Sequence, residues 1–283
     1  MNQSIIKFIL AIALLISCKI SAQNFYGEAT YFSKTKVEDA NFGDSKMDPE
    51  MVKKMNEAFK KAMEKSYVLQ FNKVESKYSE EEKLATPSIG SGDGMSMAIS
   101  MTGDFSKSYK NIQQLITISE EEIAGKEFLV TEPIKKWEWQ MSDENKKIGE
   151  YTCQKATFTE PVPEEAKKEY EEMLAKKKDG KTMFFGLTEP KPKSIIAWYT
   201  TEIPVSHGPK NYWGLPGLMM EVNDGETTLL CTKVVLNTKT VKEIKVPKTG
   251  KKVTRKEFEK IEKDRFDKMK DNESGYIMQK IER

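Results

Sequence analysis

Alternation of apolar and polar residues with a period of two is the feature that most constrains how this chain folds. Every second residue is large and apolar in the runs 67–71, 95–101 and 137–141. A period of two puts alternate side chains on opposite faces of a strand, so one face is buried and the other is solvated. Antiparallel sheets have this one-sided burial, whereas parallel sheets are covered on both faces. The pattern therefore predicts a mainly β (α+β) fold built on an antiparallel sheet.

Further runs of β-branched and aromatic residues, bounded by turn residues, extend this pattern along the chain. The expected strands are residues 26–33, 67–74, 95–101, 111–118, 126–131, 136–141, 149–158, 194–203, 218–222, 227–236 and 241–246. We expect a single curved antiparallel sheet of about ten strands, in one domain over residues 23–283, with helices packed on or beside it. Residues 75–94 are rich in Ser, Gly and charge and are expected to form an exposed loop.

Three segments have helical rather than strand signals. The expected helices lie near residues 48–65, 163–178 and 254–270. The first begins with Asp48 as the N-cap and Pro49 at the first helical position. The third begins with a capping box, in which the side chains of Thr254 and Glu257 each accept a hydrogen bond from the other residue's backbone N–H.

Residues 223–226, Asn-Asp-Gly-Glu, predict a tight β-hairpin, because Asp-Gly tolerates the positive φ of a type I′ turn. With a two-residue Asp-Gly loop, Met220 would face Leu229 and Leu218 would face Cys231. This register points the Cys231 side chain toward the core.

Residues 1–22 have the composition of a secretory leader. Lys7 precedes an apolar run over residues 8–16, which is shorter than the roughly 20 residues that span a membrane. Cleavage by signal peptidase I after Ala22 would release a soluble protein. Alternatively, the sequence Leu-Ile-Ser-Cys ending at Cys18 resembles a lipobox, which would make this cysteine a lipidated N-terminus. We expect an exported protein of the periplasm or outer membrane, attached to a membrane only if Cys18 is lipidated.

The charged residues argue against nucleic-acid binding. Lys and Arg number 46 and Asp and Glu number 44, so the formal net charge is only +2. Arg occurs only at positions 255, 265 and 283. Arg supplies the planar fork that reads phosphates and base edges, and a balanced charge supplies no attractive field. We expect no nucleic-acid partner.

Two cysteines outside the leader, Cys153 and Cys231, each lie in an expected strand. In an exported protein they could form a cross-strand disulfide, or they could be two buried free thiols. The sequence leaves both alternatives open because it does not give the Cα separation. Their wide spacing along the chain excludes a CxxC redox or zinc motif.

The strongest local motif is residues 207–219, His-Gly-Pro-Lys-Asn-Tyr-Trp-Gly-Leu-Pro-Gly-Leu-Met. Its Leu-Pro-Gly-Leu tetrad fits a type II turn, in which Pro fixes φ and Gly217 adopts a positive φ. Gly214 would let the backbone approach another group closely, and Trp213 offers a large apolar surface. The motif is either a structural corner over the core or a binding loop. The candidate ligand- or partner-binding residues are His207, Tyr212, Trp213, Gly214, Leu215, Pro216, Gly217 and Leu218.

Gly-Leu-Pro-Gly-Leu-Met at residues 214–219 resembles the signature of the GLPGLI family of exported bacterial envelope proteins, with Met in place of the final Ile. The stretches 148–157 and 197–204 and the Gly-Pro pair at 208–209 resemble the family in the same order. The resemblance extends over about residues 130–236. It implies an exported, β-rich protein with an accessory role in the envelope, and it brings no activity or residue role with it.

His207 is the only histidine, so histidine-based catalysis or metal binding depends on one position. In its predicted turn we expect this side chain to be exposed or hydrogen-bonded. The motifs GxSxG and HExxH and the P-loop do not occur in the sequence. The methionines of residues 95–101 suit core packing better than a copper(I) site. We therefore expect no catalytic residue, no metal and no cofactor.

Three functional hypotheses follow. The first is an exported, non-enzymatic binding or accessory protein, whose sheet and helices enclose an apolar cleft for an apolar ligand or a partner segment. The second is an interaction module that docks an envelope protein through residues 212–219. The third is a hydrolase that uses acidic residues. We favour the first hypothesis.

Overall fold

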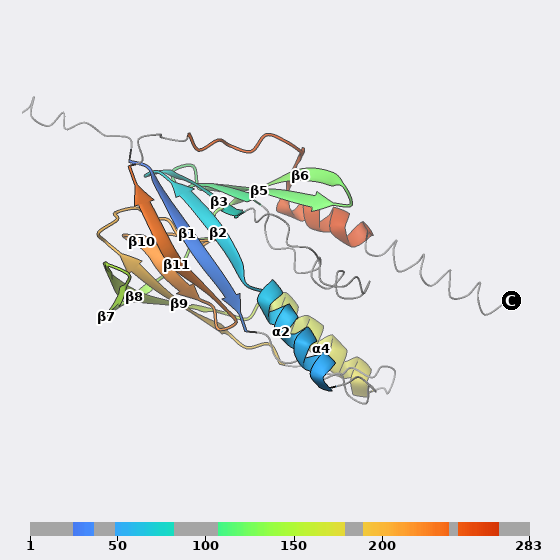
Figure 1. Ribbon diagram of the computed structural model, residues 1–283. Helices are drawn as coiled ribbons and strands as arrows, with labels where there is room; N and C mark the ends of the chain where they lie inside the picture. The colour runs from blue at the N-terminus through green and yellow to red at the C-terminus, as the bar shows by residue number, and fades with distance from the viewer. Residues whose placement is uncertain (1–24, 37–48, 82–106, 179–188, 238–242, 266–283) are drawn as a thin grey trace, which may run out of the picture.

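The computed structural model describes residues 25–36, 49–81, 107–178, 189–237 and 243–265. Its main feature is one open sheet of twelve strands (Figure 1). The strands are β1 (Gly27–Thr35), β2 (Lys65–Phe71), β3 (Glu75–Glu80), β4 (Lys107–Asn111), β5 (Ile116–Ile123), β6 (Lys126–Pro133), β7 (Gln140–Ile148), β8 (Tyr151–Glu160), β9 (Lys193–Thr200), β10 (Leu218–Asn223), β11 (Thr227–Leu236) and β12 (Lys251–Thr254). The predicted mainly β fold on a single sheet is confirmed.

The strand order shows how the sheet is built from two meanders. The order is β12-β6-β5-β4-β3-β2-β1-β11-β10-β9-β8-β7, so β1 and β11 meet in the middle. All neighbouring strands are antiparallel except β12, which runs parallel to β6. The sheet is therefore mixed, with twelve strands where about ten antiparallel strands were expected. Parallel neighbours cannot be joined by a hairpin, and β6 and β12 are separated in the chain by strands β7 to β11.

The helices lie in two places relative to the sheet. Helices α2 (Pro49–Ala62) and α4 (Glu164–Lys178) extend beyond one end of it (Figure 1). A third helix, residues 255–265, packs its Phe258 ring edge-on against Phe128 of β6, with the ring centroids 5.5 Å apart. The third helix therefore contributes an aromatic core contact to this edge of the sheet.

The capping box at the start of this third helix is confirmed. The backbone N–H of Thr254 donates to the Glu257 carboxylate over 2.7 Å, and the N–H of Glu257 donates to Thr254 Oγ1 over 3.3 Å. These bonds satisfy backbone groups that the first helical turn leaves unpaired.

One expected strand, residues 111–118, is a hairpin in the structure. The Asn111 side-chain oxygen accepts hydrogen bonds from the N–H groups of Gln113 and Gln114, over 3.1 and 2.9 Å. Leu115 then adopts a positive φ of 55°, and β5 begins at the next residue. The sequence concealed this turn, because an Asn side chain can direct a turn without Gly or Pro.

The exposed loop expected over residues 75–94 is wrong for its first part. Residues Glu75–Glu80 form β3, which pairs with both β2 and β4. Tyr78 is its single large apolar side chain and is 2% exposed. A strand with one such residue gives almost no alternation signal, which explains the error.

Other expectations fall partly or wholly outside the described residues. The leader, the strand over residues 95–101 and the end of the third helix, residues 266–270, lie there. In the strand expected over residues 241–246, the described part from residue 243 onward is not a strand.

The hairpin between β10 and β11 is confirmed, but its loop is longer than expected. Asn223 pairs with Thr228, which leaves four residues in the loop instead of two. The Asp224 carboxylate accepts the N–H groups of Glu226 and Thr227 over 3.1 and 2.6 Å and closes the turn.

The longer loop shifts the register of this hairpin by two residues. Val222, rather than Met220, faces Leu229. A shift of two residues keeps every side chain on its original face. Cys231 therefore still points inward, and it is 5% exposed.

The core consists mainly of two neighbouring apolar clusters. The first contains Ala29, Tyr31, Tyr67, Leu69, Phe71, Tyr78, Cys153, Ile203, Val205, Leu218, Met220 and Cys231. The second contains Ala156, Ile195, Ala197, Tyr199, Tyr212, Leu215, Met219, Val222 and Leu229. The Tyr31 hydroxyl of the first cluster donates to the Met219 carbonyl of the second over 2.7 Å. This buried bond joins β1 to the start of β10.

The two cysteines are free thiols buried in the first cluster. Their strands, β8 and β11, are separated in the sheet by β9 and β10, so they are not cross-strand neighbours. The disulfide alternative is therefore absent from the structure. Burial raises the pKa of Cys153 to about 11 and that of Cys231 to about 12.

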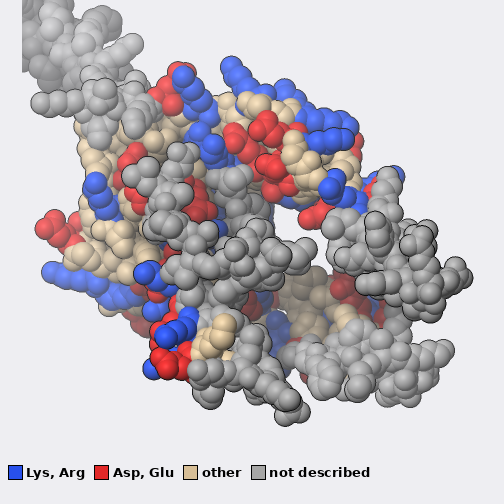
Figure 2. Space-filling model, turned by 45° about the vertical axis from the view of Figure 1, so that its right-hand side comes forward, with Lys and Arg blue, Asp and Glu red and all other residues tan. Residues whose placement is uncertain are grey.

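Charged side chains of both signs are interspersed over the face shown in Figure 2. Within the described ranges, no helix combines the length and apolar character needed to cross a membrane.

The buried thiols predict slow alkylation of the native protein. At pH 8, pKa values of about 11 and 12 leave a thiolate fraction on the order of 10⁻³ or less, and burial blocks the reagent as well. Peptide mapping after iodoacetamide treatment should show Cys153 and Cys231 unmodified in the native protein. Without any reductant, both should be fully modified in guanidinium. Resistance in guanidinium that a reductant removes would reveal a disulfide and contradict the free-thiol assignment.

Candidate functional site

The predicted binding motif lies in the connection between β9 and β10, residues 201–217, which we call the β9–β10 connection. It folds back on itself, because His207 and Trp213 pair as an isolated β-bridge and the N–H of Met219 donates to the His207 carbonyl over 3.1 Å. Most of the candidate side chains turn inward. His207, Tyr212, Leu215, Gly217 and Leu218 are buried, Trp213 is half-buried, and Gly214 and Pro216 are exposed.

Two of the three glycines in residues 207–219, Gly214 and Gly217, have roles opposite to those expected. A Cβ on Gly217 would lie 2.0 Å from the backbone oxygen of Thr200, so this glycine is required by close approach. Its φ is not in the left-handed region, and the predicted type II turn is wrong. Gly214 has the positive φ, +98°, and the nearest atoms to a Cβ there are 3.9 Å away, on Trp139.

The indoles of three tryptophans form hydrogen bonds between the β9–β10 connection and residues 134–139, the extended segment between β6 and β7. The indole N–H of Trp137 donates to the Asn211 carbonyl over 3.1 Å, and that of Trp139 to the Trp213 carbonyl over 2.9 Å. In the opposite direction, the indole N–H of Trp213 donates to the Lys135 carbonyl over 2.7 Å.

These bonds explain why the strand expected over residues 136–141 is wrong. Residues 134–139 are extended and place Trp137 and Trp139 on one face, as the alternation predicted. Their contacts, however, are with the β9–β10 connection, and β7 begins only at Gln140. A period of two indicates an extended chain with one buried face, and it does not specify that a strand covers that face.

The aromatic rings meet in a cluster that we call the aromatic platform, Trp137, Trp139, Phe158 and Tyr212. Trp137 stacks on Trp139 at 5.6 Å between centroids, with 23° between the ring planes. Phe158 meets Trp137 at 5.1 Å and 83°, and Tyr212 meets it at 4.9 Å and 40°. Stacked and edge-on pairs at these distances are the favourable aromatic geometries. Trp137, Trp139 and Phe158 are only partly buried, so the platform keeps some solvent-accessible ring surface.

A lysine and a glutamate border the platform. The Lys135 ammonium lies 4.3 Å from the Trp137 ring centroid and 5.8 Å from that of Phe158. It also forms an ion pair with the Glu160 carboxylate. The ring faces carry negative electrostatic potential, so both contacts favour a cation at this position.

A buried lysine supports the β9–β10 connection from the sheet. Lys110 of β4 is 3% exposed, and its ammonium donates to the Tyr212 carbonyl over 2.8 Å. Desolvation of the charged form lowers the pKa of Lys110 to about 7. Near neutral pH this amine is therefore close to the midpoint of its titration.

His207 is fully buried, and neither ring nitrogen makes a hydrogen bond of normal geometry among the described residues. The expectation of an exposed or hydrogen-bonded turn residue is therefore wrong. The pKa of His207 is lowered to about 3, mainly by burial and secondly by the charge of Lys110. The backbone of Asn72 has the opposite effect and raises this pKa. The imidazole is neutral at physiological pH and contacts the Phe71 ring, with 6.4 Å between centroids.

Sequence reasoning missed several residues of this site. Trp137 and Trp139 had a signal, their alternation, but it was interpreted as a strand. Phe158 was expected in a strand without a role. Lys110 and Lys135 had no signal, because the sequence has 44 other lysines and arginines and only tertiary packing distinguishes these two.

Two neighbouring carboxylates outside this site form ion pairs with an arginine. Arg255 binds both Glu132 and Glu121, over 3.0 and 3.5 Å, so these two carboxylates share one guanidinium. Among the residues that the structure places, no three His, Cys, Asp or Glu side chains are grouped to hold a metal ion.

Comparison with protein families finds one match, over residues 139–221, to a model described as "Protein of unknown function (Porph_ging)". The matched residues include Cys153, the whole β9–β10 connection and the whole Gly-Leu-Pro-Gly-Leu-Met motif. This match is consistent with a bacterial envelope family. The more specific resemblance to the GLPGLI family stays a prediction.

Two solved structures are similar over most of the chain. "Structure of PNGF-II in P21 space group" has 13% identity and a TM-score of 0.46, over 84% of this chain and 32% of that chain. "Structure of PNGF-II in C2 space group" has 12% identity and the same TM-score of 0.46, over 83% and 32%. This chain thus spans about a third of the length of the solved chains that it matches. No curated protein matches the sequence.

The glycine assignments predict different costs for two alanine substitutions. Gly217→Ala drives a Cβ into the Thr200 carbonyl and should lower the free energy of unfolding by about 3 kcal/mol. Gly214→Ala meets no close atom and should cost only the strain of a positive φ, about 1–2 kcal/mol. Urea unfolding measures both, and Gly225→Ala, with a φ of +91° in an open turn, is the control for strain alone. Equal costs at 214 and 217 would contradict the close packing of Gly217.

The buried amine of Lys110 predicts a specific pH dependence of stability. Between pH 7 and its ordinary pKa of 10.5, the unfolded chain binds a proton at this lysine that the folded chain does not. Stability therefore rises with pH in this window, by up to about 1.4 kcal/mol per unit, whereas below pH 7 Lys110 is charged in both states and its effect on stability no longer changes with pH. Lys110→Met removes the pH dependence that this amine contributes. The unfolding free energy of the wild type minus that of the variant should rise from pH 7 to 10. A difference that does not change with pH would contradict the burial of a titrating amine.

Proposed function

We propose that this chain is an exported, non-enzymatic binding protein of the cell envelope, and that the aromatic platform is its binding surface. The leader-like residues 1–22 support export. The observation that carries the proposal is the set of three indole–carbonyl bonds between residues 134–139 and the β9–β10 connection. These bonds orient the rings before any partner arrives.

Pre-orientation matters because binding costs the entropy of ordering the groups that form the contact. Trp and Tyr are efficient anchors, since each offers a large surface with only two side-chain torsions. In the platform, the indole N–H groups of Trp137 and Trp139 are already satisfied inside the protein. A partner that covers the rings therefore buries apolar area without leaving these donors unpaired.

The same geometry favours the platform over the motif alone as the contact surface. Within residues 212–218, the side chains of Tyr212, Leu215 and Leu218 are buried, which leaves the half-buried Trp213 and the exposed Pro216 at the surface. The motif therefore acts mainly as the support of the platform. Its occupant is an envelope protein or an apolar ligand, as the sequence indicated.

A hydrolase based on acidic residues is less well supported. Glu121 and Glu132 are the pair of carboxylates that Arg255 brings together, and the guanidinium occupies both. A general acid or base needs a carboxylate that can reach a substrate proton.

The proposal predicts site-selective capture of a partner. A photo-crosslinking residue at the exposed position Asn211, beside the platform, should capture one dominant envelope component in cells. The same residue at exposed Lys126, on the β5–β6 hairpin, is the control. Trp137→Leu should reduce the capture from position 211 at least about tenfold, because it removes the central ring of the platform.

Thermal unfolding of Trp137→Leu, followed in parallel, establishes that the variant is folded when capture is measured. Identical products from positions 211 and 126, or capture that survives Trp137→Leu unchanged, would contradict the platform as the binding surface.

A further inference from the structure

Two rings of the platform form a corner that encloses a positive charge. Trp137 and Phe158 stand at 83° to each other with their centroids 5.1 Å apart. The ammonium of Lys135 lies within about 6 Å of both ring centroids, the range in which cation–π attraction is significant. Glu160 pairs with the same ammonium from the side. Two aromatic walls and one carboxylate are the components by which proteins recognise ammonium groups.

The cation in this corner can leave without disturbing the corner itself. The backbone of Lys135 is held, because its carbonyl accepts the Trp213 indole N–H over 2.7 Å. The side chain is joined to that backbone by freely rotating bonds and is 40% exposed. Rotation of the side chain therefore empties the corner, while the indole–carbonyl bonds keep Trp137 in place.

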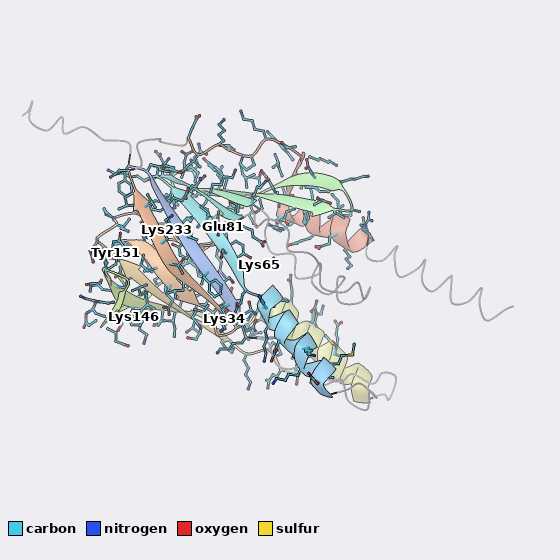
Figure 3. The ribbon with its side chains drawn as sticks, in the orientation of Figure 1. Lys34, Lys65, Glu81, Lys146, Tyr151 and Lys233 are labelled. Carbon is cyan, nitrogen blue, oxygen red and sulfur yellow. The ribbon has the colours of Figure 1, made fainter. Side chains whose placement is uncertain are left out.

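A second lysine in the structure shows what is special about this corner. Lys146 lies 4.4 Å from the Trp198 ring centroid and pairs with Glu221 over 2.7 Å. It lies with Tyr151 at the β7–β8 margin of the sheet (Figure 3). This arrangement also combines a lysine, a tryptophan and a glutamate, but among the described residues the Lys146 ammonium lies over one ring instead of two. It provides a matched comparison for the contribution of the second aromatic wall.

We propose that the Trp137–Phe158 corner is a binding site for a small organic ammonium group, which replaces the Lys135 side chain against the two rings and Glu160. The inference rests on the proposed function and specifies it, since it names the chemical group by which the platform recognises its ligand. A methylated ammonium and a primary amine share this chemistry. Lys135 is then an internal competitor, and the apparent affinity is reduced by the fraction of time for which it fills the corner.

The test is a titration followed by NMR of the tryptophan indole N–H signals. The probes are choline, ethanolamine and 3,3-dimethyl-1-butanol, which is a neutral analogue of choline with the same shape. We expect saturable shifts of the Trp137 signal with one or both cations and no shift with the neutral alcohol. The preferred cation identifies whether a methylated or a primary ammonium is the natural group. No saturable shift with either cation, or equal binding of the alcohol, would overturn the proposal.

Variants separate the roles of the residues. Lys135→Ala removes the competitor and should strengthen binding roughly fivefold. Glu160→Gln removes the carboxylate charge and should weaken binding by a similar factor. Lys146→Ala, the matched control at the single-ring site, should leave the affinity unchanged. A Lys135→Ala variant that binds no more tightly than wild type would overturn the role of Lys135 as a competitor, and with it the proposal.

Failure of the ammonium site can be distinguished from failure of the proposed function. If capture from position 211 depends on Trp137 but no cation binds, the ammonium site is wrong and the platform remains the binding surface. If capture is independent of Trp137, the proposed function fails whatever the titration shows.

Discussion

Three indole–carbonyl hydrogen bonds between residues 134–139 and the β9–β10 connection determine the shape of the site. Two run from the extended segment to the connection and one runs back. Each indole donor has a backbone acceptor, so the large rings are oriented and their polar edges are satisfied. A further bond comes from the sheet, where Lys110 of β4 donates to the carbonyl of Tyr212, the residue whose ring belongs to the platform. The connection is therefore held by two elements, and the platform depends on both sets of bonds.

The sequence indicated the fold best where local chemistry and tertiary packing agree. The helix start at Pro49, the capping box at Thr254 and the hairpin at residues 223–226 all follow from rules that operate within a few residues. The errors have a common cause. β3, β7 and the Asn111 turn are polar, edge-like or directed by a single side chain, so their strands and turns exist because of neighbours distant in sequence.

The site could be predicted only in part, for similar reasons. The motif at residues 207–219 includes Tyr212, whose ring belongs to the platform, but its interpretation gave Gly214 and Gly217 each the role of the other, because a positive φ and a close approach are both reasons for a glycine. No sequence pattern distinguishes the buried Lys110 from the other 45 Lys and Arg residues, and none shows that the lone histidine, His207, is buried. The contact of Trp137 with Phe158 joins strand β8 to a segment that is not a strand, and no periodicity predicts that contact.

The central claim is that the three indole bonds hold the platform, and hydrogen exchange of the indole N–H groups tests it most directly. Trp198 is the internal reference, since its indole N–H has no acceptor in the part of the chain that the structure describes. The account predicts slower exchange at Trp137, Trp139 and Trp213 than at Trp198. It also predicts faster exchange at Trp137 and Trp139 when Trp213→Phe removes the reverse bond. Equal exchange at all four indoles, unchanged by that substitution, would contradict it.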